Sequence, residues 1–311
     1  MQKLRTIFMG TPDFAVPCLR TLQEKTEVIA VITQPDRPKG RGHNLQASPV
    51  KQVALEYNLP VYQPEKIKTD EFTAKLEEMA PDLIVVVAFG QILSQRILDI
   101  PRLGCVNVHA SLLPRYRGAA PIHWSIINGE TETGVTTMLM DAGLDTGDML
   151  LKDSVAITQE MTTEELHDKL MAMGSRLLAD TVDGLAAGTI QPEKQDDSIS
   201  NYAGMLNKEI AHIDWTKSAA EVHNLIRGLN SWPVAWSNLD GKGFKFWQTR
   251  VLPGEAKGQP GEVEELTKKG FVVAAGKGHI EVLEIQPPSK KRMNAGDYVR
   301  GHGIAAGMVF N

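Results

Sequence analysis

One run of seven residues constrains the fold more than any other part of the chain. Residues 83–89 read Leu-Ile-Val-Val-Val-Ala-Phe, an unbroken apolar stretch rich in β-branched side chains. Strands of parallel sheets are buried on both faces and show such continuous runs, whereas strands with one wet face alternate. Shorter runs of the same kind occupy residues 6–10 and 28–33. We therefore predict a mostly parallel sheet with residues 83–89 near its centre.

Helix signals lie between the apolar runs. Ser48-Pro49 supplies an N-cap and a first helical residue, and Thr162 with Glu165 forms a capping box for a helix that runs to Ala187. Strands that alternate with helices predict an α/β, Rossmann-like fold with helices on both faces of the sheet. The turn Gly10-Thr-Pro lacks the GxGxxG spacing that holds a dinucleotide pyrophosphate, so we predict no nicotinamide or flavin site.

The last third of the chain follows a different pattern. After a helix near residues 216–229, short strands follow one another, and Asp240-Gly241 between two of them is a strong hairpin signal. This pattern predicts a small OB-like β-barrel, a fold often used to hold nucleic acid. We divide the chain into a first domain of residues 1–190, a polar linker of 191–206 and a C-terminal domain of 207–311.

Charge is divided unequally between these parts. Residues 1–206 hold 19 Lys and Arg against 27 Asp and Glu, a net charge of −8, and residues 207–311 hold 14 against 11, a net charge of +3. The positive part favours an anionic partner, although +3 also suits an ordinary surface. The sequence shows neither the apolar run of about eighteen residues typical of a membrane span nor a signal peptide. Cys18 and Cys105 lack metal-ligand spacing. We expect a cytoplasmic monomer that binds no metal and no membrane.

A polar pair follows the next strand-like segment, residues 104–109. Successive strand residues point to opposite faces, so Asn107 and His109 share one face while Val106 and Val108 point to the other. An amide and an imidazole at the end of a strand can donate hydrogen bonds to a developing negative oxygen. Taken alone, the pair is equally compatible with structural residues that satisfy a turn.

The sequence around this pair resembles a known signature. Residues 107–121, NVHASLLPRYRGAAP, are similar to the signature of the formyltransferases that use 10-formyltetrahydrofolate. The resemblance implies that Asn107 and His109 are catalytic. It also implies that Asp145, within MDAGLDTG at residues 140–147, completes the set by holding His109 in its tautomer and relaying protons. The co-substrate would be 10-formyltetrahydrofolate, used without a metal.

Two apolar loops suit such a co-substrate. They follow residues 83–89 and 104–109, and a flat heteroaromatic ring stacks well on apolar side chains while loop backbone groups bind its edge. The residues that we predict to contact folate are Phe89, Gly90, Gln91, Ile92, Leu93, Ser111, Leu112, Leu113, Pro114 and Asp141.

Two basic segments indicate the acceptor of the formyl group. QPDRPKGRGHNL, at residues 34–45, and QPPSKKRMNAGDYVRG, at 286–301, resemble segments of the family members that act on initiator methionyl-tRNA. In those members the first segment contacts the acceptor arm. The resemblance implies tRNA contacts by Arg37, Lys39, Arg41, His43, Lys290, Lys291 and Arg292.

Three alternatives stay open at this point. The family also contains enzymes that formylate an amino sugar nucleotide or a purine precursor. An RNA-binding protein that kept the fold without the activity would carry the same basic segments. The loop of residues 34–47 is also compatible with a solvated surface excursion.

Overall fold

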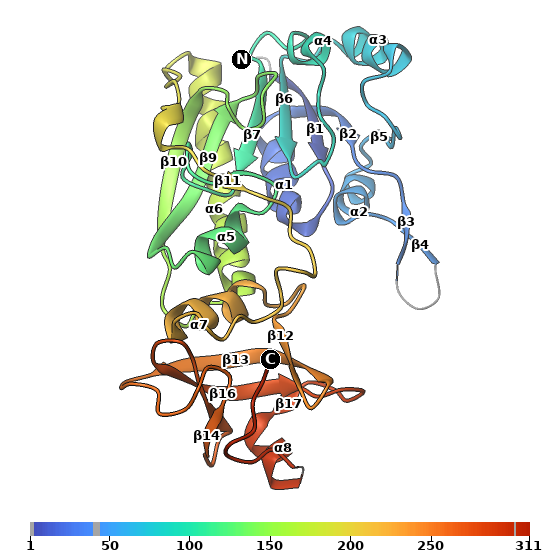
Figure 1. Ribbon diagram of the computed structural model, residues 1–311. Coiled ribbons are helices and arrows are strands. Elements are labelled where there is room, and N and C mark those ends of the chain that lie inside the picture. Colours follow the sequence, from blue (N-terminus) through green and yellow to red (C-terminus); the bar gives the residue numbers. More distant parts are fainter. Residues whose placement is uncertain (1–2, 40–43, 302) are drawn as a thin grey trace. The chain divides into compact units, whose positions relative to one another are not determined.

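The computed structural model describes residues 3–39, 44–301 and 303–311, which divide into two compact units (Figure 1). The first unit holds residues up to Gly118, Thr133–Val155 and His167–Tyr202, and the second holds Ala119–Glu132, Ala156–Leu166 and Ala203–Asn311. The chain therefore passes between the units several times. The segments 119–132 and 156–166 group with the C-terminal residues, whereas most of the predicted linker groups with the first unit.

The first unit is built on a seven-stranded sheet in the order β10-β9-β7-β6-β1-β2-β5. β6 pairs in parallel with β1 and β7, β2 pairs in parallel with β1 and β5, and β9 pairs antiparallel with β7. The predicted central strand within residues 83–89 is confirmed, but it ends at Val87, two residues earlier than predicted. The strands are β1 (Arg5–Gly10), β2 (Glu27–Ile32), β5 (Val61–Tyr62), β6 (Leu83–Val87), β7 (Cys105–His109), β9 (Glu132–Leu139) and β10 (Met149–Ala156).

Helices cover both faces of this sheet, as predicted. On one face, Ile7 and Ile84 pack in one cluster with Leu76 and Ile97, which belong to α3 and α4. On the other face, a Cβ added at Gly174 of α6 would lie 3.1 Å from Val108 Cγ1, so the glycine allows the helix to approach β7 closely. The helices are α1 (Val16–Lys25), α2 (Pro49–Glu56), α3 (Asp70–Met79), α4 (Gln95–Leu98) and α6 (Thr163–Ala187), with a 3-10 turn at Asp13–Ala15 and another at Asp197–Ile199.

The predicted helix starts are present in the structure. Ser48 Oγ accepts from the Lys51 backbone amide at 3.1 Å and caps α2. The capping box before α6 is formed, because Glu165 accepts from the Thr162 backbone amide at 2.8 Å. Two short two-stranded sheets accompany the large sheet. In one, β3 (Arg37–Lys39) pairs with β4 (Asn44–Gln46), and in the other, β8 (Arg117–Gly118) pairs with β11 (Tyr202–Ala203).

The second unit contains an antiparallel sheet in the order β12-β13-β16-β15-β14, with β17 beside β16. The sheet curls into a half-barrel around a core that includes Phe246, Phe271 and Phe310. The predicted hairpin is confirmed, since Asp240 and Gly241 both have positive φ, 51° and 71°, as a type I′ turn requires. The strands of the second unit are β12 (Trp236–Leu239), β13 (Lys242–Leu252), β14 (Val263–Leu266), β15 (Phe271–Ala274), β16 (His279–Gln286) and β17 (Met293–Asn294). Its helices are α5 (Pro121–Ile127), α7 (Ala219–Gly228) and α8 (Ala295–Gly301).

A buried histidine makes the stability of the second unit depend on pH. His223 of α7 contacts the Gln159 carbonyl through Nε2 at 3.0 Å and the Thr249 hydroxyl through Nδ1 at 2.9 Å. Burial lowers the pKa of His223, and the Gln159 carbonyl and Glu160 oppose that shift only in part. The folded state therefore binds fewer protons than the unfolded state below a pH of about 6.5, the ordinary histidine pKa.

The expected result is a loss of stability as pH falls through and below that value. Thermal unfolding measured between about pH 7.5 and pH 5 should show a falling Tm. His223→Asn should flatten this dependence, because the variant has no imidazole to protonate. A variant with the wild-type slope would show that other groups set the pH dependence.

Candidate active site

Three side chains meet beside β7, and all three were predicted from the sequence. Asn107 Nδ2 donates to Asp145 Oδ1 at 3.3 Å, and Asp145 Oδ2 lies 3.7 Å from His109 Nδ1. The Gly118 backbone amide donates to the same Oδ2 at 2.8 Å. The His109 and Asp145 side chains are only 6% and 12% exposed. The carboxylate of Asp145 is thus the shared neighbour of the amide and the imidazole.

Strand register explains how the three residues come together. Cys105 packs in the cluster that contains α3 and α4 residues, so Asn107 and His109, at alternate positions, share that face of β7. β9 runs antiparallel to β7 and places Leu139 beside Val106. The loop that follows β9 therefore begins near the amino end of β7 and has to fold back over the face of the sheet to bring Asp145 to the pair.

A backbone carbonyl sets the tautomer of His109. Nε2 lies 2.9 Å from the carbonyl oxygen of Tyr116, which can only accept a hydrogen bond, so Nε2 carries the hydrogen. Nδ1, on the side of Asp145, is then the ring atom that gains or loses a proton. The role of holding the tautomer was predicted for Asp145. In the structure the Tyr116 carbonyl fixes the tautomer of His109. The Asp145 carboxylate lies 3.7 Å from His109 Nδ1, too far for a hydrogen bond, and acts on the ring as a nearby negative charge.

The loops around the site hold strained backbone. Ala88, Tyr116 and Asp145 have φ of 47°, 60° and 55°, in the left-handed region that non-glycine residues rarely adopt. Each such conformation costs roughly 1–2 kcal/mol and persists only where tertiary contacts hold it. The site geometry is therefore imposed by contacts between loops and not by local sequence preference.

The predicted folate residues fall into two groups. Phe89, Leu93, Leu113 and Pro114 are buried and shape the loops from within. Gly90 and Ile92 are exposed, and Leu112 is half-buried. Ile92 is 77% exposed and Leu144, in the loop of Asp145, is 54% exposed. Exposed apolar side chains on these loops fit a flat ring ligand that would cover them.

The polar members of the predicted folate set have partners in the protein. Gln91 donates to the Pro64 carbonyl at 3.2 Å and accepts from the Ile67 amide at 2.8 Å. Ser111 donates to the Arg115 carbonyl at 2.7 Å. Asp141 accepts from Gly143 and Thr146 within its own loop. These bonds support the loops, and direct folate contacts by the predicted residues stay predictions.

Sequence reasoning missed a buried threonine that fixes the apolar loop. Thr136 pairs with His109 across β9 and β7. Its hydroxyl donates to the Ser111 carbonyl at 2.7 Å and accepts from the Leu113 amide at 3.1 Å. A threonine in a strand is too common to signal such a role. Gln195 and Asn201 were also missed, because the polar segment around them was read as a linker.

A cavity of about 530 Å³ opens at the carboxyl ends of β1, β2 and β6. Its lining includes Phe89 and Gly90 from the predicted folate set and Arg37 from the predicted tRNA set. Gln34 Nε2 and Thr11 Oγ1 both donate to the Phe89 carbonyl, at 3.1 and 3.2 Å. Residues assigned to two different substrates thus line one cavity.

The basic segment is anchored at its base. Lys51 Nζ donates to Asp36 Oδ2 at 2.6 Å and to Gln63 Oε1 at 2.7 Å, and Gln63 Nε2 donates to Asp36 Oδ1 at 2.7 Å. The hydrogen bond from Lys51 lowers the pKa of Asp36. Beyond this anchor the chain forms the β3–β4 hairpin, in which Arg37 pairs with Gln46. Arg41 and His43 lie outside the described residues.

The second predicted tRNA element, residues 290–292, is exposed on the second unit. Arg292 Nε donates to Glu284 at 2.8 Å, and its guanidinium lies 4.6 Å from the centre of the Trp247 ring. Lys290 Nζ lies 5.4 Å from the Tyr298 ring. The contact of this triplet with tRNA stays a prediction.

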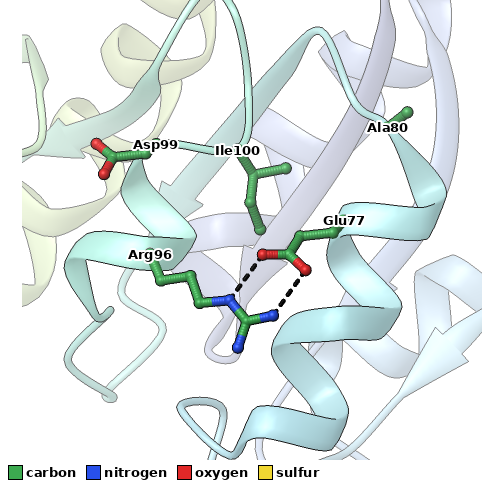
Figure 2. Close-up of a pocket in the computed structure, with 5 residues that line it drawn as sticks. All are labelled: Glu77, Ala80, Arg96, Asp99 and Ile100. Carbon is green, nitrogen blue, oxygen red and sulfur yellow. Dashed lines mark hydrogen bonds and ion pairs between the residues drawn. The ribbon is translucent and has the colours of Figure 1, made fainter.

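A second hollow, of about 610 Å³, lies between α3 and α4 (Figure 2). Figure 2 shows the side chains of Arg96 and Glu77 turned toward each other, and two parallel bonds of 2.7 and 2.8 Å join them. This pairing raises the pKa of Arg96 and lowers that of Glu77. Because the guanidinium and carboxylate neutralise each other, we assign no ligand to this hollow.

Other site classes receive no support from the described ranges. No group of three or more His, Cys, Asp and Glu side chains there could hold a metal ion. No described helix has the length and apolarity needed to cross a bilayer. Cys18 and Cys105 are buried, and burial raises the pKa of each thiol to about 12, as expected of unreactive core cysteines.

The chain is similar to known proteins in both sequence and fold. Residues 3–182 match the formyl transferase family, and residues 205–303 match the formyl transferase C-terminal domain. Two solved structures share the fold. An N-formyltransferase from Helicobacter canadensis has a TM-score of 0.69 at 22% identity, covering 91% of this chain and 99% of its own. HypX from Aquifex aeolicus, solved with tetrahydrofolic acid, has a TM-score of 0.62 at 16% identity, covering 95% of this chain and 47% of its own.

Curated relatives are much more similar in sequence. A methionyl-tRNA formyltransferase from Clostridium botulinum is 53% identical over 307 residues, 98% of this chain and 99% of the relative. One from Clostridium novyi is 54% identical over 97% of this chain and 98% of its own. One from Trichlorobacter lovleyi is 53% identical over 98% and 96%. The chain therefore belongs to the formyl transferase family, among the methionyl-tRNA formyltransferases.

Proposed function

We propose that the protein transfers the formyl group of 10-formyltetrahydrofolate to the free amino group of initiator methionyl-tRNA, with Asn107, His109 and Asp145 as its catalytic residues. The observation that carries this proposal is the convergence of these side chains around one carboxylate, within 3.3 to 3.7 Å. The cavity beside β6 supports it, because Arg37 lines the same space as Phe89 and Gly90.

The proposed reaction depends more on stabilisation of the developing oxyanion than on activation of the amine. The amine of an aminoacyl ester resembles an α-amino group, whose pKa is about 8, so much of it is neutral near pH 7. When the amine attacks the formyl carbon, negative charge develops on the formyl oxygen. An amide nitrogen has two hydrogens, and Asn107 gives only one of them to Asp145. The second hydrogen is available to that oxygen.

His109 is the residue that transfers protons in the proposed reaction. The amine loses a proton as its bond to carbon forms, and the departing nitrogen gains one as its bond to carbon breaks. Because Nε2 is committed to Tyr116, Nδ1 is the ring atom that can carry this proton. Asp145, 3.7 Å away, stabilises the protonated ring. Bound 10-formyltetrahydrofolate supplies the formyl group, and Gly90, Ile92, Leu112 and Leu144 would hold its ring.

One assay tests the acceptor. The protein is incubated with 10-formyltetrahydrofolate and methionyl-tRNA, and formylmethionine is measured after hydrolysis of the ester. An amino sugar nucleotide and uncharged tRNA serve as parallel acceptors. We expect formylation of methionyl-tRNA alone. Formylation of the sugar nucleotide only would move the protein to another branch of the family, and product from none of the three acceptors would contradict the proposed activity. The cytoplasmic location and the monomeric state stay predictions.

The β3–β4 hairpin is expected to bind tRNA and not folate. Arg37 is exposed, and Arg41 lies in the same basic segment. Arg37→Ala and Arg41→Ala should each raise KM for methionyl-tRNA, and loss of one phosphate contact should reduce the salt slope of binding by about 1. Titration with tRNA at several salt concentrations, and separately with a folate analogue, measures both effects.

Arg20→Ala is the matched control, because Arg20 is an exposed arginine of α1 paired with Glu56. It should change neither titration. If Arg37→Ala and Arg41→Ala lose folate affinity while tRNA affinity stays intact, the hairpin belongs to the other substrate. If neither affinity changes, the basic segment is a solvated surface loop.

A further inference from the structure

Gln195, in the segment predicted as a linker, is a buried side chain that contacts both loops of the active site. It is only 7% exposed. Its Nε2 donates to the carbonyl oxygens of Asp145 and Gly147, at 2.8 and 2.7 Å. Its Oε1 accepts from Arg117 Nε at 3.0 Å. One side chain thus joins the loop that carries Asp145 to the loop that follows His109.

The same segment reaches His109 through Tyr116. Asn201 Oδ1 accepts from the Tyr116 backbone amide, and the Asn201 carbonyl accepts from the Arg117 amide at 3.1 Å. The Tyr116 carbonyl in turn fixes His109 Nε2. Upstream, Glu193 and Met149 exchange two backbone hydrogen bonds of 2.8 Å, which tie the start of the segment to β10. Residues 193–201 are therefore hydrogen-bonded to the sheet and to both catalytic loops.

The Asp145 loop needs such a support for two reasons. Its base is closed by a hydrogen bond of 2.8 Å from the Leu139 amide to the Asp148 carbonyl, but from there the loop has to fold back over the sheet to reach Asn107. Asp145 also has a φ of 55°, which is strained for a residue with a side chain. The two bonds from Gln195 hold the carbonyls on either side of Thr146 and so maintain that backbone.

We propose that Gln195 is a positioning residue for the formyl transfer reaction, acting through the backbone of Asp145. Gln195 holds the Asp145 carboxylate against Asn107 and His109, and Arg117 holds the amide of Gln195 in the orientation that donates to both carbonyls. The inference rests on the proposed function, because a displacement of Asp145 is detected through the rate of formyl transfer.

The test is a double-mutant cycle between Gln195 and Asp145. Gln195→Met keeps the size of the side chain but removes both donations. We expect kcat to fall by ~10–10², since a displacement of about 1 Å in a catalytic group can cost ~10²-fold. KM for methionyl-tRNA should stay within about twofold, because no tRNA contact is touched. In an Asp145→Asn background the same change should lower kcat less than about twofold, because there is no carboxylate left to position.

Controls separate positioning from general destabilisation. Gln195→Ala removes the same bonds and leaves space in which water can satisfy the carbonyls, so it provides a second variant if Gln195→Met does not fold. Thr6→Val is the matched control. It removes a buried hydrogen bond of 2.7 Å to Thr26 near the amino end of β1. It should lower Tm and leave kcat unchanged.

The outcomes distinguish the two proposals. Wild-type kcat in a folded Gln195 variant, or an equal loss of kcat in both Asp145 backgrounds, would overturn the positioning role and leave the proposed function standing. A wild-type preparation that forms no formylmethionine would overturn the proposed function, and the positioning role with it.

Discussion

Alanine in place of Asn107 is expected to lower kcat by ~10²–10³, the usual cost of removing one donor to a developing oxyanion. Alanine in place of His109 is expected to lower kcat by ~10²–10⁴, the range of a general acid–base contribution. Both side chains lie on one face of β7 and approach the same carboxylate. Asn107→Ala removes the donor and leaves Asp145 with its bond from Gly118. His109→Ala removes Nδ1, the ring atom that can carry the proton. Steady-state formylation with both substrates saturating measures the effect.

A second substitution at the histidine separates chemistry from folding. In His109→Gln the amide nitrogen can replace ring Nε2 as donor to the Tyr116 carbonyl, so the buried bond of 2.9 Å is preserved. The variant should fold like the wild type and still be slow, because an amide does not carry a proton near neutral pH. His167→Ala is the control, since His167 packs on Phe14 in the same unit. Near-wild-type turnover in Asn107→Ala or His109→Gln would remove that residue from the mechanism.

Sequence patterns predicted the elements of the fold that depend on local physics. The apolar run at residues 83–89 specified a buried strand, and Asp240-Gly241 specified the hairpin because the turn needs two residues with positive φ. The alternation in β7 placed Asn107 and His109 on one face. Each of these features is determined by residues close together in the sequence.

The parts that could not be predicted depend on contacts between distant residues. The Tyr116 carbonyl sets the His109 tautomer, but any residue type supplies a carbonyl, so no sequence signal marks it. Gln195 lies 50 positions from Asp145 in a stretch whose polar composition is typical of a linker. Its burial follows from the fold of the loops around it. The assignment of residues 156–166 to the second unit could not be predicted from the sequence either. The capping box at Thr162 predicts where a helix begins, but it does not indicate which part of the protein that helix start packs against.

The other large effect is expected from Asp145→Asn, which should lower kcat by ~10²–10⁴, the range of a general acid–base contribution. The carboxylate accepts from Asn107 at one oxygen and from Gly118 at the other, and the second oxygen faces His109 Nδ1. An asparagine has a single acceptor oxygen. If that oxygen keeps the bond to Gly118, the amide nitrogen faces the donor of Asn107, and Asn107 has to turn its donor away from the reacting oxygen. The substitution also removes the charge that stabilises a protonated His109.

Asp141→Asn is the matched control for this variant. Asp141 lies in the same loop, is exposed, and accepts from Gly143 and Thr146, bonds that an asparagine oxygen can also accept. The loop should therefore keep its shape, and kcat should stay near the wild-type value. KM for 10-formyltetrahydrofolate in this variant tests the predicted folate contact of Asp141 at the same time. If Asp145→Asn instead loses folate affinity and keeps kcat, the Asp145 carboxylate binds the folate ring, and proton transfer by His109 does not depend on it.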